Sequence, residues 1–414
     1  MNRLMILGSL DEFVELVNCA KRRGYYTVVC DGYPNGPAKK FADKAYTIDI
    51  REVDAIVEVC KQEKINGIIA SFSDILFEYL TLIANKAGIK TYCTPEKMVY
   101  LRSKAKMKEM FRSLDIPVPA SKVIRRGSLQ EDMAEVDFPI LIKPVDGYGS
   151  RGIYIVESSE EIIEKFDEIA GYSNYPDQIL AEEYNQGYEF NMANWIIDGE
   201  VCTLGLADRE KTAENPKELP HISRVVYPSK LASKVYEEAR SIIKKVADYT
   251  GIQTGPICMQ FFWSEKSGIQ VCECAGRLFG YEHELWTMGS GLSVEELLLD
   301  YVYDEGHMRK SLENYTPFYK KIVAGLYFHG DKGVIQDMSA VKRIANSPEV
   351  EDALIFYKEG DVIGTKPYVA RFYISSDSYE KIDEITEKIN NEMVIPDESG
   401  RNLVYHNEIT RYPM

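Results

Sequence analysis

The chain has 414 residues, of which 45% are hydrophobic and 28% are charged, and its formal net charge is -16. This length exceeds the roughly 250 to 300 residues that one hydrophobic core serves, so we expect two or three domains. The acidic balance argues against binding to nucleic acid or to acidic membrane surfaces. It remains compatible with a local basic pocket for a phosphorylated ligand.

Targeting segments and disulfides are not expected either. Residues 1–10 form a short apolar stretch that is followed at once by Asp11 and Glu12, unlike a signal peptide. No stretch approaches the roughly 18 apolar residues of a membrane-spanning helix. The eight cysteines lack paired Cys-x-x-Cys spacing, so reduced and mostly buried thiols are expected. The sequence therefore predicts a cytoplasmic protein.

Residues 1 to about 100 alternate between strand and helix patterns. Apolar runs at 3–8 and 25–30 flank an amphipathic stretch at 11–23, which is a βαβ pattern. The loop after the first run lacks the Gly-x-Gly-x-x-Gly fingerprint of dinucleotide-binding proteins. Further strands are expected at 45–50 and 67–71, and further helices at 53–64 and 75–87. The segment predicts a small doubly wound α/β domain.

Residues 140–156 consist of two apolar runs joined by a glycine-rich loop that contains Gly147, Gly149 and Gly152. Such a loop lets the backbone approach a ligand and point successive N–H groups at an anion, and Lys143 adds a positive charge at its base. We interpret the stretch as a β-hairpin whose tip closes over phosphates. The alternative is an ordinary turn between two strands.

Three lysines lie at the start of a predicted helix that precedes this hairpin, namely Lys104, Lys106 and Lys108. A solvated basic face is the ordinary explanation for such a run. Because the helix lies just upstream of the glycine loop, one of these lysines could instead reach a phosphate.

Residues 178–197 predict a strand, a turn at Gly187 and a second strand. Backbone groups in such a connection can pair with the edge of a base. A carboxylate such as Glu189 can accept hydrogen bonds from ribose hydroxyls. Surface glutamates without a ligand are the equal alternative.

Two apolar runs joined by a turn-rich tetrad predict a second hairpin at residues 257–275. If Ser264 pairs with Ile269, Gln260 lies directly opposite Glu273. A glutamate inside a strand costs several kcal/mol to bury unless a cation or another partner compensates it. An ordinary ion pair with the arginine that follows the hairpin is one explanation, and a bound cation is the other.

From about residue 322 the pattern predicts a separate α/β unit. Strands are expected at 322–328, 334–338, 353–357 and 368–375, and helices at 339–346 and 378–391. No residue pattern in this unit suggests chemistry of its own, so we expect a packing or lid-supporting role.

Taken together, these residues resemble the ATP-grasp superfamily, and the resemblance covers nearly the whole chain. Ser103-Lys104 resembles the family's lysine at a helix start, although aspartate often precedes that lysine. The second lysine with its glycine loop, the adenine hinge, the ribose-binding glutamate and the Glu-x-Asn-x-Arg motif have counterparts in the same order. These counterparts are Lys143 with Gly147, Gly149, Ser150 and Gly152; Glu182, Glu183 and Tyr184; Glu189; and Glu273 with Arg277.

The resemblance implies an ATP-grasp fold that combines α/β and α+β elements. An N-terminal doubly wound α/β domain, the pre-ATP-grasp domain, is expected at residues 1–100. The ATP-grasp domain is expected at 101–321, with a lid subdomain at about 115–185. A small C-terminal α/β domain is expected at 322–414.

Within the superfamily, the Pro228-Ser229-Lys230-Leu231 entry to a long helix and the Glu-Cys-Ala-Gly-Arg ending are most similar to amino-acid ligases and related carboxylate-amine ligases. The resemblance implies transfer of the ATP γ-phosphoryl group to a carboxylate. An amine or a similar nucleophile would then attack the acylphosphate. Arg277 would hold the transferring phosphoryl group or the oxyanion that follows. ATP and Mg²⁺ are the implied cofactors, with Mn²⁺ as an alternative ion.

The chain departs from the family at the metal site, which commonly has an acidic residue, a glutamate and an asparagine. Gln260, Glu273 and Ala275 stand at these positions. Glutamine removes a formal charge from a site for hard cations, although its amide oxygen can still bind Mg²⁺. The expected metal ligands are therefore Glu273 and Gln260. The alternative function is a nucleotide-binding protein of the same fold with little or no ligase activity, because its metal site is degenerate.

The sequence does not identify the acceptor. A small-molecule carboxylate and an amine are the expected partners, nucleic acid and membranes are not, and a homodimer is left open. Residues after Arg277 are candidates for lining the acceptor pocket, namely Tyr281, Glu282, His283, Glu284 and Trp286. A lone histidine beside two glutamates is otherwise a structural or surface group.

Overall fold

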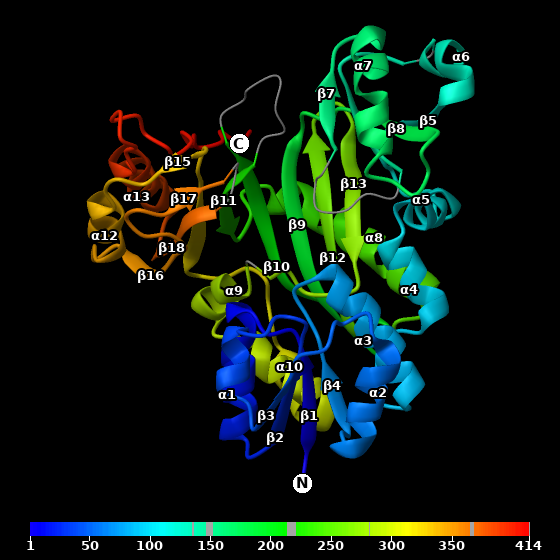
Figure 1. The fold of residues 1–414 in the computed structure, drawn as a ribbon, viewed down its shortest axis with the longest axis vertical. Helices are drawn as coiled ribbons and strands as arrows, with labels where there is room; N and C mark the ends of the chain where they lie inside the picture. The colour runs from blue at the N-terminus through cyan, green and yellow to red at the C-terminus, as the bar shows by residue number, and fades with distance from the viewer. Residues whose placement is uncertain (135, 146–151, 213–220, 281, 365–367, 414) are drawn as a thin grey trace.

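A computed structural model describes residues 1–134, 136–145, 152–212, 221–280, 282–364 and 368–413. The molecule is built around one large antiparallel sheet (Figure 1). An N-terminal unit lies at one end of this sheet, a lid rises above its other end, and a C-terminal unit lies at its side (Figure 1). In the part of the chain that is described, no helix is long and apolar enough to span a membrane.

The N-terminal unit contains a parallel sheet with the strand order β3-β2-β1-β4. Strands β1, β2 and β4 are mostly buried and apolar because helices cover both faces of a parallel sheet, whereas the edge strand β3 is largely exposed. The strands are β1 (Arg3–Leu7), β2 (Tyr26–Cys30), β3 (Lys44–Tyr46) and β4 (Gly67–Ile69). The helices are η1 (Asp11–Phe13), α1 (Val14–Arg22), η2 (Pro37–Lys40), α2 (Val53–Gln62) and α3 (Asp74–Ala87). The predicted βαβ pattern and doubly wound fold are confirmed.

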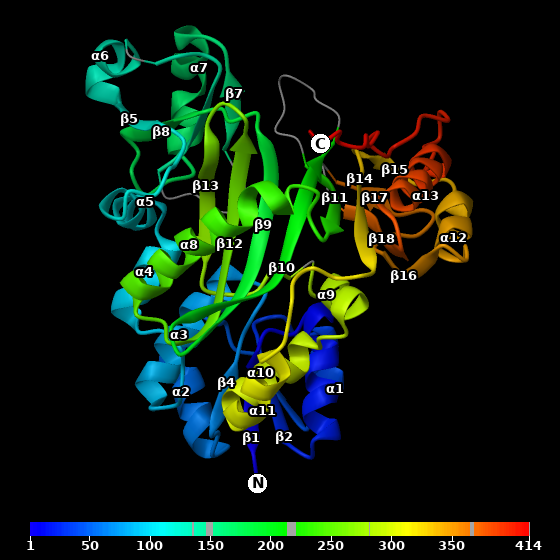
Figure 2. The ribbon, with the colours of Figure 1, turned by 180° about the vertical axis from the view of Figure 1, so that it is seen from behind.

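Two helices from much later in the chain complete this unit. The segments α10 (Val294–Tyr303) and α11 (Glu305–Leu312) lie against the N-terminal sheet (Figure 2). The guanidinium of Arg23 pairs with the Asp300 carboxylate at 2.5 Å, and Lys90 Nζ donates to the carbonyl of Tyr301 at 2.6 Å. The N-terminal unit therefore depends on residues near position 300.

The central sheet has eight strands in the order β13-β12-β9-β10-β11-β14-β18-β16, and every neighbouring pair is antiparallel. Its strands are β9 (Tyr188–Ile197), β10 (Glu200–Lys211), β11 (Ile222–Tyr227), β12 (Thr254–Ser264), β13 (Gly268–Ala275), β14 (Ile322–His329), β16 (Val350–Ile355) and β18 (Tyr368–Ser376).

One face of this sheet is covered by α8 (Ala232–Thr250), the long helix after β11. The buried residues Val235, Ala239, Ile242 and Val246 recur every three or four positions, so they form one apolar stripe along the helix. This stripe shares a core with Met192 and the other strand residues of that face. The polar residues that were predicted to form a site, Gln260 and Glu273 among them, are left for the opposite face.

The lid is a second antiparallel sheet with the order β5-β8-β6-β7. Its elements are β5 (Ser121–Arg125), η3 (Arg126–Ser128), α6 (Leu129–Met133), β6 (Ile140–Pro144), β7 (Tyr154–Val156), α7 (Ser159–Ala170) and β8 (Gln178–Glu183). The predicted hairpin is present, because Ile140 pairs with Val156 and Ile142 with Tyr154. The loop residues Gly147, Gly149 and Ser150 lie outside the described residues.

Two helices connect the N-terminal unit to the lid, namely α4 (Pro95–Arg102) and α5 (Lys104–Ser113). Ser103 ends the first and caps the second, since its hydroxyl accepts a hydrogen bond from the amide of Lys106. Lys104 is therefore the first residue of a helix, as predicted.

Most of the described C-terminal strands belong to the central sheet, and only the short strands β15 (Gly333–Val334) and β17 (Val362–Ile363) pair with each other in a separate two-stranded sheet. Strand β14 pairs with β11, with Tyr227 opposite Val323, so β14, β18 and β16 extend the central sheet across position 322. The proposed domain limits stay a prediction, but the sheet is shared between the parts. The remaining elements are α9 (His283–Ser290), α12 (Ser339–Ala345) and α13 (Tyr379–Glu392).

The eight cysteines are all free, as expected, and six of them are buried.

Candidate active site

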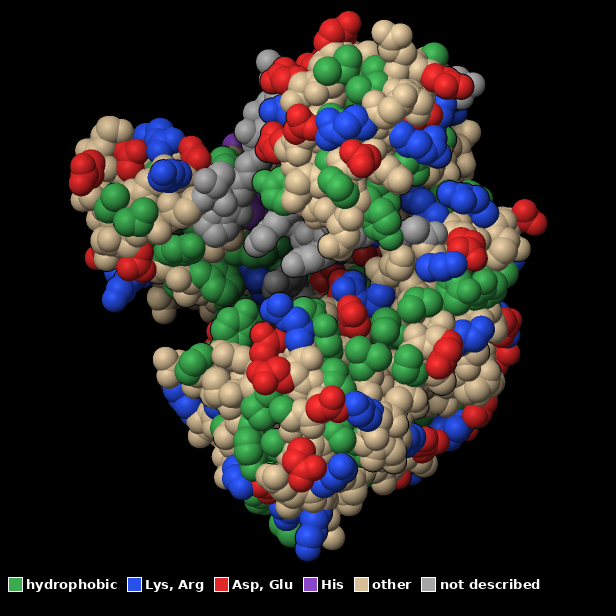
Figure 3. All heavy atoms as spheres, turned by 45° about the vertical axis from the view of Figure 1, so that its right-hand side comes forward, with side chains coloured by type: hydrophobic (Ala, Val, Ile, Leu, Met, Phe, Trp, Pro, Cys, Tyr) green, Lys and Arg blue, Asp and Glu red, His purple; other side chains and the backbone are tan. Residues whose placement is uncertain are grey.

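A hollow lies between the lid and the N-terminal unit, and basic and acidic side chains gather at its edge (Figure 3). Several residues named from the sequence converge there. Charges from the lid and from the central sheet act electrostatically on the thiol of Cys272 on β13, namely those of Lys143, Glu182, Glu189 and Glu273. The charges of Lys104 and Arg277 likewise act on Asp74 at the start of α3. The structure thus gathers residues from four separate segments of the chain.

A lysine–glutamate–lysine bridge ties the lid to α5. Lys143 Nζ on β6 lies 2.6 Å from Glu182 Oε1 on β8, and Lys108 Nζ pairs with the other oxygen of the same carboxylate. Burial alone would raise the pKa of Glu182, but the two ammonium groups outweigh it and hold this pKa below its ordinary value. The bridge fixes Lys143 at the base of the glycine loop.

The helix spacing explains which lysines of α5 face the site. Lys104 and Lys108 are four residues apart and so lie on the same face of the helix, whereas Lys106 points elsewhere and pairs with Glu109 at 2.7 Å. Lys108 contacts Glu182. The sequence did not show which of the three alternating lysines would make such a contact. Burial lowers the pKa of Lys108 despite this contact.

The predicted adenine hinge lies at the end of β8, which contains Glu182 and Glu183, and continues to Tyr184. The amide of Glu183 donates to the carbonyl of Ala120 at 2.8 Å, and its carboxylate accepts from the Ala120 amide at 3.2 Å. Glu183 is thus engaged in the lid, next to the start of β5. Beyond it, residues 184–189 line a cavity of about 260 Å³ together with Arg209, Lys211, Thr212 and part of the C-terminal segment.

Glu189, the predicted ribose ligand, lies in this cavity and is only 9% exposed. Its two carboxylate oxygens pair with Arg209 Nε at 2.8 Å and with Lys211 Nζ at 3.1 Å. Burial would raise the pKa of Glu189, but Lys211 and Arg209 lower it below its ordinary value. The carboxylate is therefore ionised and fixed in place, and its remaining lone pairs can accept hydrogen bonds from a ligand.

The proposed metal ligands face each other across the second hairpin. Gln260 pairs with Glu273 in the β12–β13 register, as predicted. The pairing nearer the turn differs from the expected one, because Ser264 pairs with Gly268 and not with Ile269. A register shift between Gln260 and Phe261 nevertheless places Gln260 opposite Glu273. Neither side chain makes a hydrogen bond or an ion pair with another described residue. Their free amide and carboxylate oxygens are ligands of the kind that Mg²⁺ prefers, so the pair fits such an ion.

Arg277 is held by the N-terminal unit. Its Nε and Nη2 atoms each lie 2.9 Å from an oxygen of Asp74, the first residue of α3, which is a bidentate ion pair. Burial would raise the pKa of Asp74, but Arg277 lowers it. Sequence analysis considered an ion pair of Arg277 with Glu273 and missed Asp74. In the sequence, Asp74 is recognisable only as an acidic residue at the start of a predicted helix, and the helix dipole alone explains such a residue.

The loop that carries Arg277 is fastened to the N-terminal unit at further points. The hydroxyl of Tyr92 donates to the carbonyl of Gly276 at 2.7 Å. A Cβ atom at Gly276 would lie 2.4 Å from the ring of Phe77, so only glycine allows this approach. Phe72 and Phe279 form a parallel bridge. These contacts fix the backbone on both sides of the arginine.

The residues after Arg277 divide between a buried network and a titratable cluster. Glu282 is buried and accepts hydrogen bonds from Asn191 Nδ2 at 2.8 and 2.9 Å, and it pairs with Arg209 at 3.2 Å. His283 is buried too, stacks on Phe72 at 4.6 Å and lies with Nδ1 3.0 Å from the carbonyl of Gly280. Both residues are thus engaged in the fold. Tyr281 lies outside the described residues.

Glu12 and Glu284 form the titratable cluster with the charges around them. Burial raises the pKa of Glu12 to about 7, against the opposing effects of His283 and Arg371. Burial also raises the pKa of Glu284. Glu12 further interacts electrostatically with Glu284 and with Arg277. Glu12, whose pKa is raised, thus lies within electrostatic reach of the arginine of the candidate site.

Comparisons with known proteins decide the family of this region. Residues 136–283 match the family described as ATP-grasp domain, and residues 4–91 match the family described as PylC-like, N-terminal domain. The protein contains an ATP-grasp domain. The predicted resemblance and fold class are therefore confirmed, and the site described above lies largely within the ATP-grasp match.

Relatives of known name match part of this chain and share part of their own length with it. A D-alanine--D-alanine ligase of Wolbachia sp. subsp. Drosophila simulans is 26% identical over 153 residues, which is 37% of this chain and 47% of the ligase. A formate-dependent phosphoribosylglycinamide formyltransferase of Methanocaldococcus jannaschii is 27% identical over 267 residues, 60% of this chain and 63% of the relative. The matches thus span about half to two thirds of these relatives.

Solved structures share the fold over almost the whole chain. An L-amino acid ligase from Bacillus licheniformis superposes with a TM-score of 0.77 at 16% identity, covering 96% of this chain and 99% of the ligase. A second structure is the biotin carboxylase domain dimer of the Hydrogenobacter thermophilus 2-oxoglutarate carboxylase, in complex with MgADP. It superposes with a TM-score of 0.72 at 17% identity, and the match covers 94% of this chain and 89% of that domain. The fold shared with these structures therefore includes the C-terminal unit.

Proposed function

We propose that this protein is an ATP-dependent ligase that joins a small-molecule carboxylate to an amine or a similar nucleophile. The carboxylate would be activated as an acylphosphate, and ADP and phosphate would be released. The observation that carries the proposal is the end of β13, where Glu273 has no hydrogen-bond or ion-pair partner among the described residues and Arg277, four positions later, is held by Asp74. An unpaired carboxylate for a cation and an arginine fixed beside it suit the transfer of a phosphoryl group.

Each residue has a role that follows from its place. Lys143 and Lys104 would lie against phosphate oxygens, and Glu189 would accept hydrogen bonds from the sugar hydroxyls. Glu273 and Gln260 would hold Mg²⁺, which supplies charge neutralisation of the phosphates when it is bound. Arg277 would bind the transferring phosphoryl group, and Asp74 would keep the guanidinium oriented.

The proposed chemistry has two steps. A carboxylate oxygen attacks the γ-phosphorus while the bond to the bridging oxygen breaks, so ADP leaves with that electron pair. The amine nitrogen then attacks the acyl carbon, the C–O bond to phosphate breaks, phosphate leaves and the nitrogen loses a proton to solvent. Because water would hydrolyse the acylphosphate, closure of the lid over the hollow would protect it.

The proposal also includes the cofactors, the oligomeric state and the location of the protein. ATP and Mg²⁺ are supported by the solved relative in complex with MgADP, whereas Mn²⁺ stays an alternative ion. That relative is a dimer, and a homodimer stays a prediction for this chain, as does a cytoplasmic location. Small-molecule substrates fit the names of the relatives, which include ligases of amino acids.

A second candidate function is nucleotide binding without ligase activity, and Gln260 is the observation that favours it. The experiment that separates the two measures ADP release with a panel of amino acids and amines, with and without Mg²⁺. Mass spectrometry of a reaction with ATP and a metabolite extract would then identify the product. ATP binding without ADP formation in any mixture would decide for the second function.

A further inference from the structure

The last residues of the chain cross the end of the central sheet and finish beside the candidate active site (Figure 1). The amide of Tyr405 donates to the carbonyl of His329 at the end of β14 at 3.0 Å. Asn407 then forms an antiparallel bridge with Thr212, and the amide of Thr410 donates to Glu210 Oε2 at 3.0 Å. The segment thus runs from the end of β14 to the end of β10.

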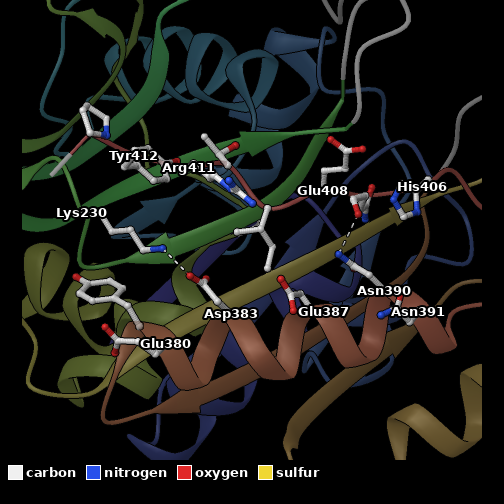
Figure 4. A pocket seen from close by; sticks show the side chains of 15 residues that line it. Lys230, Glu380, Asp383, Glu387, Asn390, Asn391, His406, Glu408, Arg411 and Tyr412 are labelled. Atoms are coloured by element: carbon white, nitrogen blue, oxygen red, sulfur yellow. Dashed lines mark hydrogen bonds and ion pairs between the residues drawn. The ribbon is translucent and has the colours of Figure 1, made fainter.

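Both ends of this crossing are anchored. Asn407 is buried, donates through Nδ2 to the carbonyl of Tyr327 at 3.2 Å and accepts at its own carbonyl from Asn390 Nδ2 at 3.1 Å (Figure 4). Five residues later, the ring of Tyr412 packs on that of Tyr188 with centroids 5.2 Å apart. Tyr188 begins β9, directly before Glu189. The path of the intervening residues is therefore defined.

The segment separates two cavities. The cavity of about 260 Å³ that contains Glu189 has residues of the predicted hinge on one side and four residues of the tail, Glu408, Ile409, Thr410 and Tyr412, among its lining. A larger cavity of about 800 Å³ lies between the tail and α13 (Figure 4). Arg411 and Pro413 line only this outer cavity.

We propose that four tail residues, Glu408, Ile409, Thr410 and Tyr412, form a wall of the nucleotide pocket and set its affinity for the nucleoside part of ATP. This inference rests on the proposed function, because it takes the cavity at Glu189 as the nucleotide site. The physical reason is that the wall shields the ion pairs of Glu189 with Arg209 and Lys211 from water. Charge pairs and hydrogen bonds to a ligand are stronger where water is excluded.

The test uses a shortened chain that lacks the wall residues but keeps Asn407, which anchors the start of the tail. A chain that ends at Asn407 should bind ATP about tenfold more weakly than the full chain in isothermal titration calorimetry, since an ordered wall of the pocket is lost. A matched control removes residues 413–414, and a second control is Arg411→Ala. Arg411 and Pro413 line only the outer cavity, so in both controls the ATP dissociation constant should stay within about twofold of the full chain's.

Equal ATP binding by the full chain and by the chain that ends at Asn407 would overturn the inference. If the shortened chain does not melt cooperatively, Tyr412→Ala takes its place and should weaken ATP binding about fivefold, because it removes the ring that anchors the wall. Tyr412→Phe should bind normally, and equal binding by Tyr412→Ala would again refute the wall. Absence of ATP binding by the full chain would refute the proposed function together with this inference, whereas normal binding by both chains refutes the wall alone.

Discussion

Asp74 and Arg277 form a bidentate ion pair that joins the N-terminal unit to the end of β13, with both N–O distances at 2.9 Å. The two residues are 203 positions apart in the chain. The arginine is the residue proposed to hold the transferring phosphoryl group, and in this proposal the aspartate acts only by orienting the guanidinium. The N-terminal unit thus takes part in the site by orienting a residue of the ATP-grasp domain.

We expect Asp74→Asn to lower kcat about 10- to 100-fold and to change the KM for ATP less. The amide keeps the shape of the side chain but leaves the Arg277 charge without its partner, which also costs about 1–3 kcal/mol of stability for a partly buried pair. Steady-state kinetics and thermal melting would measure both effects.

A matched control for this variant is Asp54→Asn. Asp54 lies in the same unit and pairs with Lys86 on the surface, where ion pairs contribute little. It should leave kcat and the melting temperature nearly unchanged. Normal kcat in the Asp74 variant would show that Arg277 does not need this partner.

Lys143→Ala should weaken ATP binding about 10- to 100-fold, because it removes a positive charge next to the predicted phosphate loop. The fold should persist, since Glu182 keeps its contact with Lys108. Calorimetric titration with ATP measures the effect, and Lys106→Ala, on the exposed side of α5, is the control. An unchanged dissociation constant for ATP would place the phosphate-binding lysine elsewhere.

Two substitutions at the proposed metal site should have opposite effects, since one removes a negative charge from the site and the other adds one. Glu273→Ala should lower turnover by at least about 100-fold, because it removes the only acidic ligand of the proposed pair. Gln260→Glu should lower the Mg²⁺ concentration for half-maximal activity by about 3- to 10-fold, because it adds a formal charge to the site. Glu265→Ala, in the exposed turn of the same hairpin, should do neither. Near-normal kcat in Glu273→Ala would refute its role as a ligand.

Glu12 predicts a dependence of stability on pH. Burial raises the pKa of this carboxyl from 4.5 to about 7 in the folded protein. Between these two values the unfolded chain releases a proton that the folded chain keeps, so the contribution of Glu12 to stability is fully present below about pH 4.5 and is lost as the pH rises to about 7. The loss should amount to about 1–3 kcal/mol.

The variant Glu12→Gln has no proton to release at this position. Relative to the native protein, it should therefore gain stability when the pH is raised from 5 to 8. Thermal melting of both proteins at the two pH values measures this difference, and Asp11→Asn at the exposed neighbouring position is the control. Equal changes in the native protein and in Glu12→Gln would contradict the prediction.

Local patterns allowed most elements to be predicted from the sequence. Apolar runs predicted β6 and β7, and the helix expected at 378–391 is observed as α13 at Tyr379–Glu392. The pairing of Gln260 with Glu273 was also correct. The irregularity that produces it was not foreseen, because β-bulges depend on the neighbouring strand and have little local signal.

Contacts between distant segments could not be predicted in the same way. The pairing of β14 with β11 and the packing of α10 on the N-terminal unit depend on which surfaces meet after the elements have formed. The role of Asp74 and the contact of Lys108 with Glu182 were missed for the same reason, since Asp74 and Arg277, like Lys108 and Glu182, are far apart in the sequence. Such ion pairs carry no periodic pattern that a single sequence reveals.

The central claim, that this protein activates a carboxylate as an acylphosphate, is tested most directly by trapping the intermediate. Hydroxylamine is a small nucleophile that converts an acylphosphate into a hydroxamate without any need for the natural amine. The full chain would be incubated with ATP, Mg²⁺, hydroxylamine and a panel of amino acids and other carboxylic acids. The account predicts a hydroxamate and ADP in equal amounts with at least one acid, and their loss in Glu273→Ala. ATP binding with no hydroxamate and no ADP for any acid would contradict it.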